Sequence, residues 1–245
     1  MSAMASYLVL VRMHLQSFRP EIPVVVAVQI AFAVGFVLGF GYLIPDIDNT
    51  TALFITVGAA TQNLVMVGCV MLPQFLAMGR QEGRLDYFLS LPISREAYLL
   101  ANVTVAACFA LPGVALAILV GMLRYDLDFS VSPALLVVVP MVILALAGVG
   151  IAMVIFIPGQ AAVVALTQVV IFYVIFFSPV LIPAERLPGV LQFTAQLLPP
   201  SYAADAMRAS LTGLPDTNLA RSLAALTLFG VLSSVASAIA IRHRG

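Results

Sequence analysis

The sequence predicts an all-α membrane protein that crosses the bilayer six times. Of its 245 residues, 62% are hydrophobic and only 9% are charged, a composition outside the range of soluble proteins. The long apolar runs are continuous rather than alternating, which favours helices over a β-barrel. Five charge-free runs can each hold a span of about 20 residues. The run from Asp128 to Glu185 is long enough for two spans, because Pro158-Gly159 divides it.

The predicted spans form one domain covering residues 1–245, because neither an internal repeat nor a low-complexity linker divides the chain. Their approximate limits are 22–45, 50–78, 98–123, 130–157, 160–183 and 222–241. Two cysteines, Cys69 and Cys108, fall within the second and third spans. We therefore expect free thiols that pack against neighbouring helices rather than a disulfide framework.

An additional helix is expected before the first span. Residues 2–19 place apolar side chains at alternating steps of four and three, on a face formed by Met4, Leu8, Val11, Leu15 and Phe18. Arg12 and Arg19 flank this face. We interpret the segment as an amphipathic helix that lies on the membrane surface.

The chain is expected in the inner membrane, and the placement of its arginines predicts that both termini are cytoplasmic. With the N-terminus inside, short cytoplasmic segments hold most of the arginines, which is the usual bias of membrane proteins. These arginines are Arg12, Arg19, Arg80, Arg84, Arg95, Arg242 and Arg244. The long segment after the fifth span, predicted to lie outside, carries three further arginines and thus favours the opposite orientation. Long segments, however, contribute little to this bias.

The stretch from Gly79 to Tyr98 gathers charge between two uncharged runs, with Arg80, Glu82, Arg84, Asp86, Arg95 and Glu96. One face of a helix here would carry Leu85, Phe88 and Leu89, and another would carry Arg80, Gln81 and Arg84. Pro92 would break this helix, and Ser94 would cap the next one. One interpretation is a solvated connector with anchoring arginines. We favour a docking element, since a helix followed by an elbow presents both charge and apolar side chains.

Residues 184–221, between the fifth and sixth spans, are predicted to form two short helices in the outer leaflet. The first has a helical face formed by Leu187, Val190, Leu191, Thr194 and Leu198. Pro199-Pro200 would end it, and Ser201 would cap a second helix that runs to about Leu211. Asp205 lies early in this second helix, with Arg208 one turn later as its ion-pair partner.

Few polar residues fall inside the spans. Hydrogen bonding between helices is the interpretation we favour for them. The alternative is a weakly polar lining for an amphiphilic substrate, for which the candidates are Gln62, Asn63, Gln168 and Tyr173.

The sequence also excludes several kinds of chemistry. It contains no lysine, which removes the P-loop lysine and Schiff-base catalysis. Its two histidines, His14 and His243, lie near predicted cytoplasmic ends, so no metal site or Ser–His relay is expected in the membrane. The predicted spans hold no Asp, Glu, His, Lys or Arg, which disfavours a proton-coupled transporter. A net charge of zero gives no reason to expect nucleic acid.

Two motifs resemble those of bacterial ABC-2-type permeases, the membrane subunits of ABC exporters related to daunorubicin-type drug efflux. The first is Glu82-Gly83-Arg84-Leu85-Asp86, followed by Leu89 and Leu91-Pro92-Ile93-Ser94-Arg95. The second is Leu198-Pro199-Pro200-Ser201-Tyr202, followed by Asp205, Ala206 and Arg208. Pro200 and Arg84 depart from the usual family residues, which bears on local geometry more than on membership.

This resemblance implies roles for both motifs. The 80–96 loop would be a coupling helix that contacts a separate ATP-binding subunit through Arg80, Glu82, Arg84, Leu85, Asp86, Phe88, Leu89 and Arg95. The outer helix pair would be an external gate containing Leu187, Leu191, Pro199, Tyr202, Asp205 and Arg208. ATP and Mg²⁺ would bind the partner subunit, so the chain itself would carry no cofactor and no enzymatic activity.

The resemblance also implies an exporter of amphiphilic drug-like or lipid-like molecules. The permease would work with a second copy of itself or a similar permease, in contact with membrane lipids. The competing hypothesis is a membrane scaffold or assembly factor that recruits a cytosolic protein through the 80–96 loop.

Overall fold

The computed structural model describes residues 3–20, 22–44, 47–84, 95–181, 188–212 and 218–242, and all regular structure in these ranges is helical. The predicted all-α class is therefore confirmed. The predictions for Leu85, Asp86, Phe88, Leu89 and Leu187 lie outside the described residues. Arg95 is described only as the first residue of a helix.

The first described helix, α1 (Ala3–Phe18), matches the predicted N-terminal helix. Its position on a membrane surface stays a prediction. Arg19 and Pro20 separate it from α2 (Ile22–Leu43), the first candidate span. Pro23 lies in the first turn of α2, where a missing N–H costs no helical hydrogen bond.

The second span is a continuous helical segment of 33 residues from Asn49 to Gln81, here called the central segment. It consists of α3 (Asn49–Val65), the π-helix η1 (Met66–Met71) and α4 (Leu72–Gln81). Pro73 follows η1 and has no N–H to donate to the preceding turn. The wider winding of η1 accommodates this proline without ending the helix.

The next three helices are α6 (Arg95–Tyr125), α7 (Leu135–Phe156) and α8 (Gln160–Phe177). The turn between α7 and α8 contains Gly159 with a φ of 85°, which glycine adopts without steric cost. Prolines explain two boundaries that differ from the prediction. Ser132 and Ser178 each precede a proline, which disfavours helical backbone. Consequently α7 begins at Leu135 rather than near 130, and α8 ends at Phe177 rather than near 183.

Two short helices and one long helix complete the described fold. α9 (Gly189–Ala195) and α10 (Pro199–Leu211) occupy the positions of the predicted helix pair, and α11 (Leu219–Arg242) follows. The expectation that Ser201 caps the second of these helices is wrong, because α10 begins at Pro199 with Leu198 as its N-cap. Proline is tolerated in a first turn, so the two prolines start α10 instead of ending α9.

Five described helical segments are long and apolar enough to cross a membrane. They are α2, the central segment, α6 from Leu100 onward, α7 and α8. The apolar stretch found in α11, Leu219–Ser233, is shorter. The chain is therefore a multi-pass membrane protein, and the sixth span stays a prediction.

The central segment lies inside the bundle. In its most apolar stretch of 18 residues, 83% of the residues are buried, against 17% in the corresponding stretch of α2 and 22% in that of α8.

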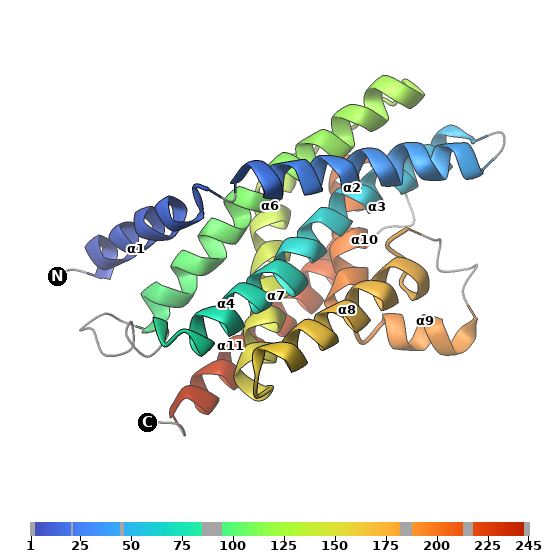
Figure 1. Ribbon diagram of the computed structural model, residues 1–245. Helices are drawn as coiled ribbons and strands as arrows, with labels where there is room; N and C mark the ends of the chain where they lie inside the picture. Colours follow the sequence, from blue (N-terminus) through green and yellow to red (C-terminus); the bar gives the residue numbers. More distant parts are fainter. Residues whose placement is uncertain are drawn as a thin grey trace.

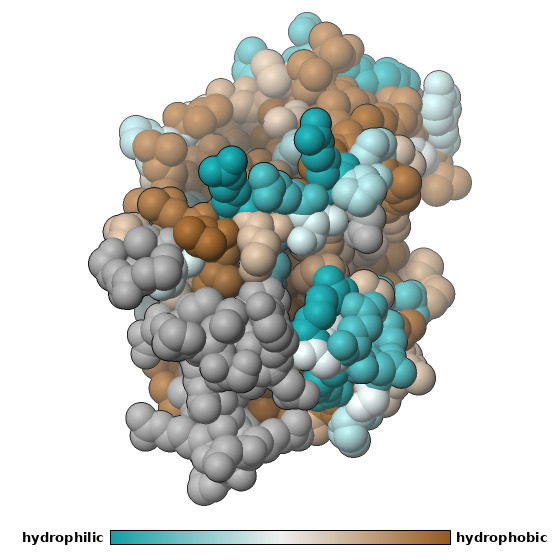
Figure 2. Space-filling model, turned by 60° about the vertical axis from the view of Figure 1, so that its left-hand side comes forward, coloured by the Kyte–Doolittle hydropathy of each residue, from teal (hydrophilic) through white to brown (hydrophobic). Residues whose placement is uncertain are grey.

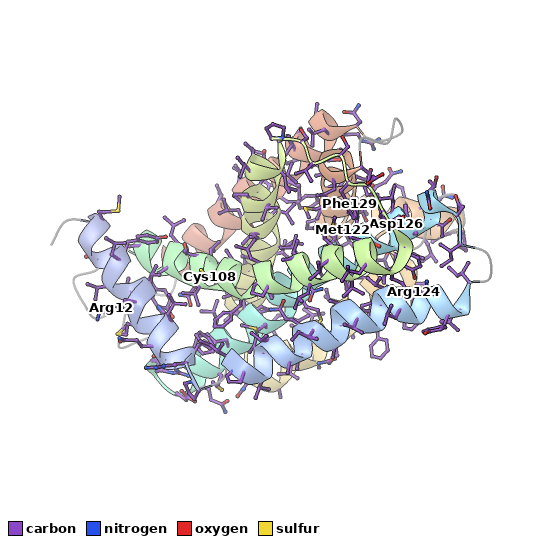
Figure 3. The ribbon with its side chains drawn as sticks, turned by 90° about the horizontal axis from the view of Figure 1, so that it is seen from above. Arg12, Cys108, Met122, Arg124, Asp126 and Phe129 are labelled. Carbon is purple, nitrogen blue, oxygen red and sulfur yellow. The ribbon has the colours of Figure 1, made fainter. Side chains whose placement is uncertain are left out.

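Figure 1 shows α1, the end of α4, the start of α6 and the end of α11 at one end of the molecule, with α9 toward the other. The end with the termini comes forward in Figure 2, where hydrophilic residues gather among hydrophobic ones. In Figure 3, Arg12 and Arg124 mark opposite ends of the bundle, with Cys108 between them on α6.

Small residues bring α7 close to the central segment. A Cβ atom built on Gly150 would overlap the carbonyl oxygen of Gly68. Next to this contact, the thiol of Cys69 donates a hydrogen bond to the carbonyl oxygen of Leu146 at 3.6 Å. Both cysteines are free, as predicted, but only Cys69 packs inside the bundle; Cys108 is exposed, so the expected packing of this thiol is wrong. Small residues let membrane helices pack by van der Waals contact where the hydrophobic effect offers little attraction between them.

We predict that Gly150→Ala lowers the thermal unfolding midpoint of the purified protein in detergent. The new methyl group would meet backbone atoms, which cannot rotate away, so we expect a loss of about 1–3 kcal/mol. The control is Gly230→Ala, because a Cβ there meets nothing within 4 Å and alanine favours helix. Equal midpoints for the two variants would contradict the proposed close packing.

Candidate functional site

The charged stretch after the central segment begins with a turn. α4 ends at Gln81, and Gly83 adopts a φ of 73°. The N–H of Glu82 binds the Met78 carbonyl at 3.0 Å, and the N–H of Gly83 binds the Arg80 carbonyl at 3.2 Å. A glycine in this conformation is a common helix terminator. Arg80 and Arg84 therefore do not share one continuous helix, and this part of the sequence-based prediction is wrong.

Arg80 contacts the end of a neighbouring helix. Its guanidinium donates to the carbonyl oxygen of Val154 and, at 2.9 Å, to that of Ile157. These carbonyls belong to the C-terminal end of α7, where acceptors lack helical partners and cations are favoured. Arg80 thus joins the end of α4 to the end of α7, and its contact with a partner subunit stays a prediction.

Glu82 and Arg84 form an ion pair at the surface. The carboxylate of Glu82 lies 2.7 Å from Nε of Arg84, and the two side chains are 50% and 39% exposed. Arg84 also lies over the ring of Phe75, 5.3 Å from its centroid. Exposed ion pairs contribute little to stability, so this pair chiefly orients the two charges.

Aromatic contacts link this turn to α1. The ring of Phe18, at the end of α1, lies 4.1 Å from that of Phe75 and 5.3 Å from that of Phe109. Farther along α1, the hydroxyl groups of Tyr7 and Thr104 are 2.8 Å apart, which joins α1 to α6. The N-terminal helix is therefore held against both α4 and α6.

His14 is buried where α1 meets α6. Its Nδ1 lies 2.8 Å from the carbonyl oxygen of Leu10, and its ring is 5.6 Å from that of Tyr98. Burial lowers the pKa of His14 below 6.5, the hydrogen bond to Leu10 partly opposes this, and the charge of Arg84 lowers it further. The neutral imidazole is therefore the form that packs here.

Polar residues inside the bundle bond mainly to backbone. Gln29 donates to the carbonyl of Phe109, three residues before Pro112, and Asn63 donates to the carbonyl of Ala59 at 3.0 Å. Gln62 is fully buried, and neither its oxygen nor its nitrogen has a hydrogen-bond partner among the described residues.

The structure does not gather the four candidate pathway residues in one place. Gln62 and Asn63 are buried in the central segment, whereas Gln168 is exposed on α8. Tyr173 instead makes a hydrogen bond with Thr194, which connects α8 to α9. A role of these four residues in transport stays a prediction.

Among the predicted gate residues, Arg208 combines hydrogen bonds, an ion pair and a cation–π contact. Its side chain is 4% exposed and donates to the carbonyls of Pro179 at 2.8 Å and Val180 at 2.6 Å. It also pairs with Asp205 at 3.2 Å, which confirms the predicted ion pair, and its guanidinium lies 3.6 Å from the centroid of the Phe54 ring. One side chain therefore joins α10, α3 and the chain after α8.

Other gate residues support the same arrangement. Pro199 is buried and Leu191 is half-buried, while the hydroxyl of Tyr202 donates to the carbonyl of Gln196 at 2.8 Å. The hydroxyl groups of Ser178 and Ser201, 3.2 Å apart, form a further link between α10 and the end of α8. Their contribution to a gate stays a prediction.

Sequence reasoning missed the close approach at Gly58. A Cβ built on Gly58 would overlap the carbonyl oxygen of Val180, so glycine lets the chain after α8 lie against α3. Its partner lies more than a hundred positions away, and no local pattern in the sequence indicates it. Phe54, which receives the Arg208 cation, was missed for the same reason.

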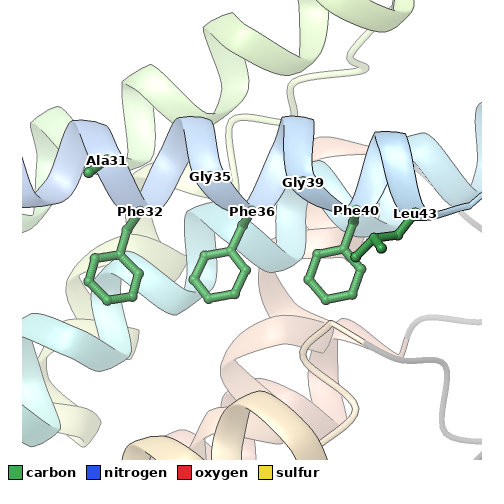
Figure 4. A pocket seen from close by; sticks show the side chains of 7 residues that line it. All are labelled: Ala31, Phe32, Gly35, Phe36, Gly39, Phe40 and Leu43. Carbon is green, nitrogen blue, oxygen red and sulfur yellow. The ribbon is translucent and has the colours of Figure 1, made fainter.

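A shallow, open apolar groove of about 370 Å³ runs along one face of α2, which alone supplies its lining. Its lining residues are Ala31, Phe32, Gly35, Phe36, Gly39, Phe40 and Leu43. Figure 4 shows the three phenylalanines pointing the same way from successive turns of the helix. The rings of Phe36 and Phe40 are stacked with centroids 6.2 Å apart. The side chains that line the groove are aromatic or aliphatic, and none of them is charged.

Two observations limit the chemistry available. The five candidate spans contain no Asp, Glu, His or Lys, and their only arginines, Arg80 and Arg124, lie close to span ends. Among the described residues, no group of three or more His, Cys, Asp or Glu is placed to hold a metal ion.

These features define a multi-pass helical membrane protein with a charged turn at one end and a pair of short helices near the other. The family model of the ABC-2 type transporter matches residues 5–212, from the start of α1 to the residue after α10. The chain therefore belongs to the ABC-2 type transporter family. Comparison with curated proteins gives no match.

Family membership identifies the general role of the chain. It is the permease component of an ABC transporter and not itself the ATPase. An ABC ATP-binding subunit is its implied partner.

We predict that Arg208→Gln lowers the thermal unfolding midpoint more than Arg208→Lys does. Glutamine leaves buried carbonyls without a cationic donor, at a cost of about 1–3 kcal/mol for each. Lysine keeps the charge but cannot match the planar, forked contacts of arginine. Arg124→Gln, at an exposed position, is the control and should leave the midpoint unchanged. A midpoint for Arg208→Gln equal to that of the control would refute the structural role.

We also predict that acid loosens α1. Because the pKa of His14 is lower in the folded protein than its ordinary 6.5, its contribution to packing is present above pH 6.5 and is lost as the pH falls through the folded value. A nitroxide label at Arg12→Cys, with Cys69 and Cys108 replaced by alanine, should become more mobile at pH 5 than at pH 7.5. The same increase in a His14→Gln background would show that another group is responsible.

Proposed function

We propose that the chain exports amphiphilic drug-like or lipid-like molecules across the inner membrane, as part of a complex with a second permease and ABC ATP-binding subunits. Its termini and charged turn would lie in the cytoplasm, and α9 and α10 would lie at the outer side. The apolar groove along α2 carries this proposal, because aromatic carbon without charge suits a neutral or amphiphilic cargo.

The poor burial of α2 supports a role in a pathway between two permeases. Only 17% of the residues in its most apolar stretch are buried within the chain. A Cβ atom built on Gly35 or Gly39 meets nothing within 4 Å, so this face of α2 is open. Glycines spaced by four residues are typical of close helix contacts in membranes. A second copy would thus complete the groove that one chain leaves open.

Energy would enter mechanically rather than by proton movement. The candidate spans lack Asp, Glu, His and Lys, the residues on which proton-coupled transporters depend. At the charged turn, Arg84 contacts Phe75, Phe75 contacts Phe18, and Arg80 contacts the end of α7. A displacement of the turn by an ATP-binding subunit would therefore act on α1, α4 and α7 together.

The scaffold hypothesis remains the alternative for the whole complex. It shares the docking turn but needs no route through the membrane, and the α2 groove favours the exporter. The two hypotheses differ in whether cargo stimulates ATP hydrolysis.

We predict that cargo raises the ATPase activity of the complex reconstituted with its ABC ATP-binding subunit. A panel of neutral amphiphilic drugs, phospholipids and glycolipids would be tested, and active compounds should accumulate inside inside-out vesicles. Phe36→Ala should weaken the stimulation several-fold, because it removes the middle ring of the groove. Leu136→Ala, at a residue 82% exposed on α7, is the control. ATP hydrolysis without movement of any compound would contradict the export proposal.

We further predict that exchanging the charges of Glu82 and Arg84 uncouples the complex. The double variant Glu82→Arg with Arg84→Glu keeps an ion pair within the turn but reverses the charges presented to a partner. Because charge complementarity governs specificity at interfaces, co-purification of the ATP-binding subunit and stimulated turnover should both fall. Normal coupling in the double variant would mean that the turn only needs its internal ion pair.

A further inference from the structure

A second, polar pocket lies between α9, α10 and α11, apart from the groove along α2. Its volume is about 240 Å³. α9 contributes Gln192, and Gln196 follows directly after this helix; α10 contributes Tyr202 and Asp205, and α11 contributes Arg221 and Ser222. The pocket thus combines hydroxyl, amide and charged groups, whereas the α2 groove is apolar.

The pocket lining contains one carboxylate, that of Asp205, and one guanidinium, that of Arg221. The carboxylate of Asp205 is already compensated, because it pairs at 3.2 Å with Arg208, which is buried. The side chain that carries the Arg221 guanidinium is exposed. Among the described residues, no carboxylate lies within ion-pair distance of Arg221. The site therefore favours an anion.

The start of α11 strengthens this preference. The side-chain oxygen of Asn218 accepts a hydrogen bond of 3.0 Å from the backbone N–H of Arg221, so Asn218 caps the helix. The N–H of Ser222 is also taken, by the carbonyl oxygen of Asn218 at 3.1 Å, so the first turn of α11 attracts an anion through its dipole. Ser222 is 3% exposed and lines the pocket, and its hydroxyl has no hydrogen-bond partner among the described residues. A hydroxyl donor that the pocket can reach therefore lies next to Arg221.

The opposite face of α9 indicates where the anion comes from. Val190 and Phe193 on α9 are 76% and 64% exposed, and Leu197 just after it is 58% exposed, while Gln192 on α9 lines the pocket. A short helix with an apolar outer face and a polar inner face suits the boundary between hydrocarbon and headgroups. Acyl chains can lie along this apolar face while a headgroup reaches the polar pocket.

We propose that this pocket binds the phosphate of a phospholipid headgroup from the membrane leaflet beside α9. Arg221 provides the cation, the first turn of α11 provides the positive end of its dipole, and Ser222 donates its hydroxyl. The lipid joins α9, α10 and α11 by occupying the pocket they share. This inference does not rest on the proposed cargo or on the direction of transport.

The test uses the full chain, purified in detergent and titrated with dioleoylphosphatidylglycerol, with bound lipid measured by native mass spectrometry. The unmodified protein should retain this lipid at one site. Arg221→Gln should bind it about tenfold or more weakly, as expected for the loss of a charge-assisted contact, and Ser222→Ala a few-fold more weakly. Arg124→Gln, an exposed arginine outside the pocket, should bind like the unmodified protein.

Two further ligands identify the recognised group and its source. Dioleoylglycerol, which keeps the acyl chains but lacks phosphate, should not be retained. Glycerol phosphate should bind far more weakly than the lipid, since it lacks the chains that lie on α9. Equal lipid binding by Arg221→Gln and the unmodified protein, or equal retention of dioleoylglycerol, would overturn the phosphate site. Glycerol phosphate binding as tightly as the lipid would overturn the lipid source.

The variants also separate this site from folding and from transport. Because Arg221 is exposed, Arg221→Gln should unfold at the same temperature as the unmodified protein when no lipid is added. Added phosphatidylglycerol should then raise the unfolding temperature of the unmodified protein and of Arg124→Gln, but not of Arg221→Gln. No ATPase or cargo enters this measurement, so its outcome is independent of the export proposal.

Discussion

The arrangement of the bundle depends on how the backbone carbonyls after α8 are satisfied. The chain leaves helical conformation at Ser178, so the carbonyls of Pro179 and Val180 lose their helical partners. In an apolar interior such groups must find other donors. Arg208 supplies them from α10, and its own charge is balanced by Asp205 and by the face of the Phe54 ring. This contact fixes three parts of the chain that are distant in sequence.

Tight packing at the centre contrasts with loose packing at the edge. Glycines bring α7 against the central segment and bring the chain after α8 against α3, so these elements have little freedom to separate. The helices α2 and α8 bury much less of their surface within the chain. Exposed faces on a membrane helix can meet lipid, a second copy or cargo, whereas a packed core cannot. The centre of the bundle therefore fixes the positions of its helices, and the edge has the surfaces that the proposed cargo or second copy could contact.

The sequence predicts the helices well because continuous apolar runs and prolines are local signals. The turn at Pro158-Gly159, the N-terminal helix and the Asp205–Arg208 pair all follow from neighbouring residues. The π-helix η1 was not predicted, since six residues of wider winding leave no distinct hydrophobic period. The helix stop at Gly83 was missed although a glycine after the last turn is a local stop signal, because the helical spacing of Arg80, Gln81 and Arg84 favoured a continuous helix. Contacts such as those of Arg80 with α7 join residues more than seventy positions apart, beyond any local pattern.

The central segment physically connects the two ends at which function is proposed. Near one end, Phe54 and Gly58 contact Arg208 and the chain after α8; at the other, Phe75 and Arg80 contact Arg84 and α7. A helix transmits axial displacement well, because stretching it would break its hydrogen-bond ladder. The π-helix lies between these ends, where its wider turn already departs from the regular ladder and can change winding at lower cost. A movement imposed at the charged turn would therefore reach Arg208 through a single element, with η1 as the place where its length or rotation can adjust.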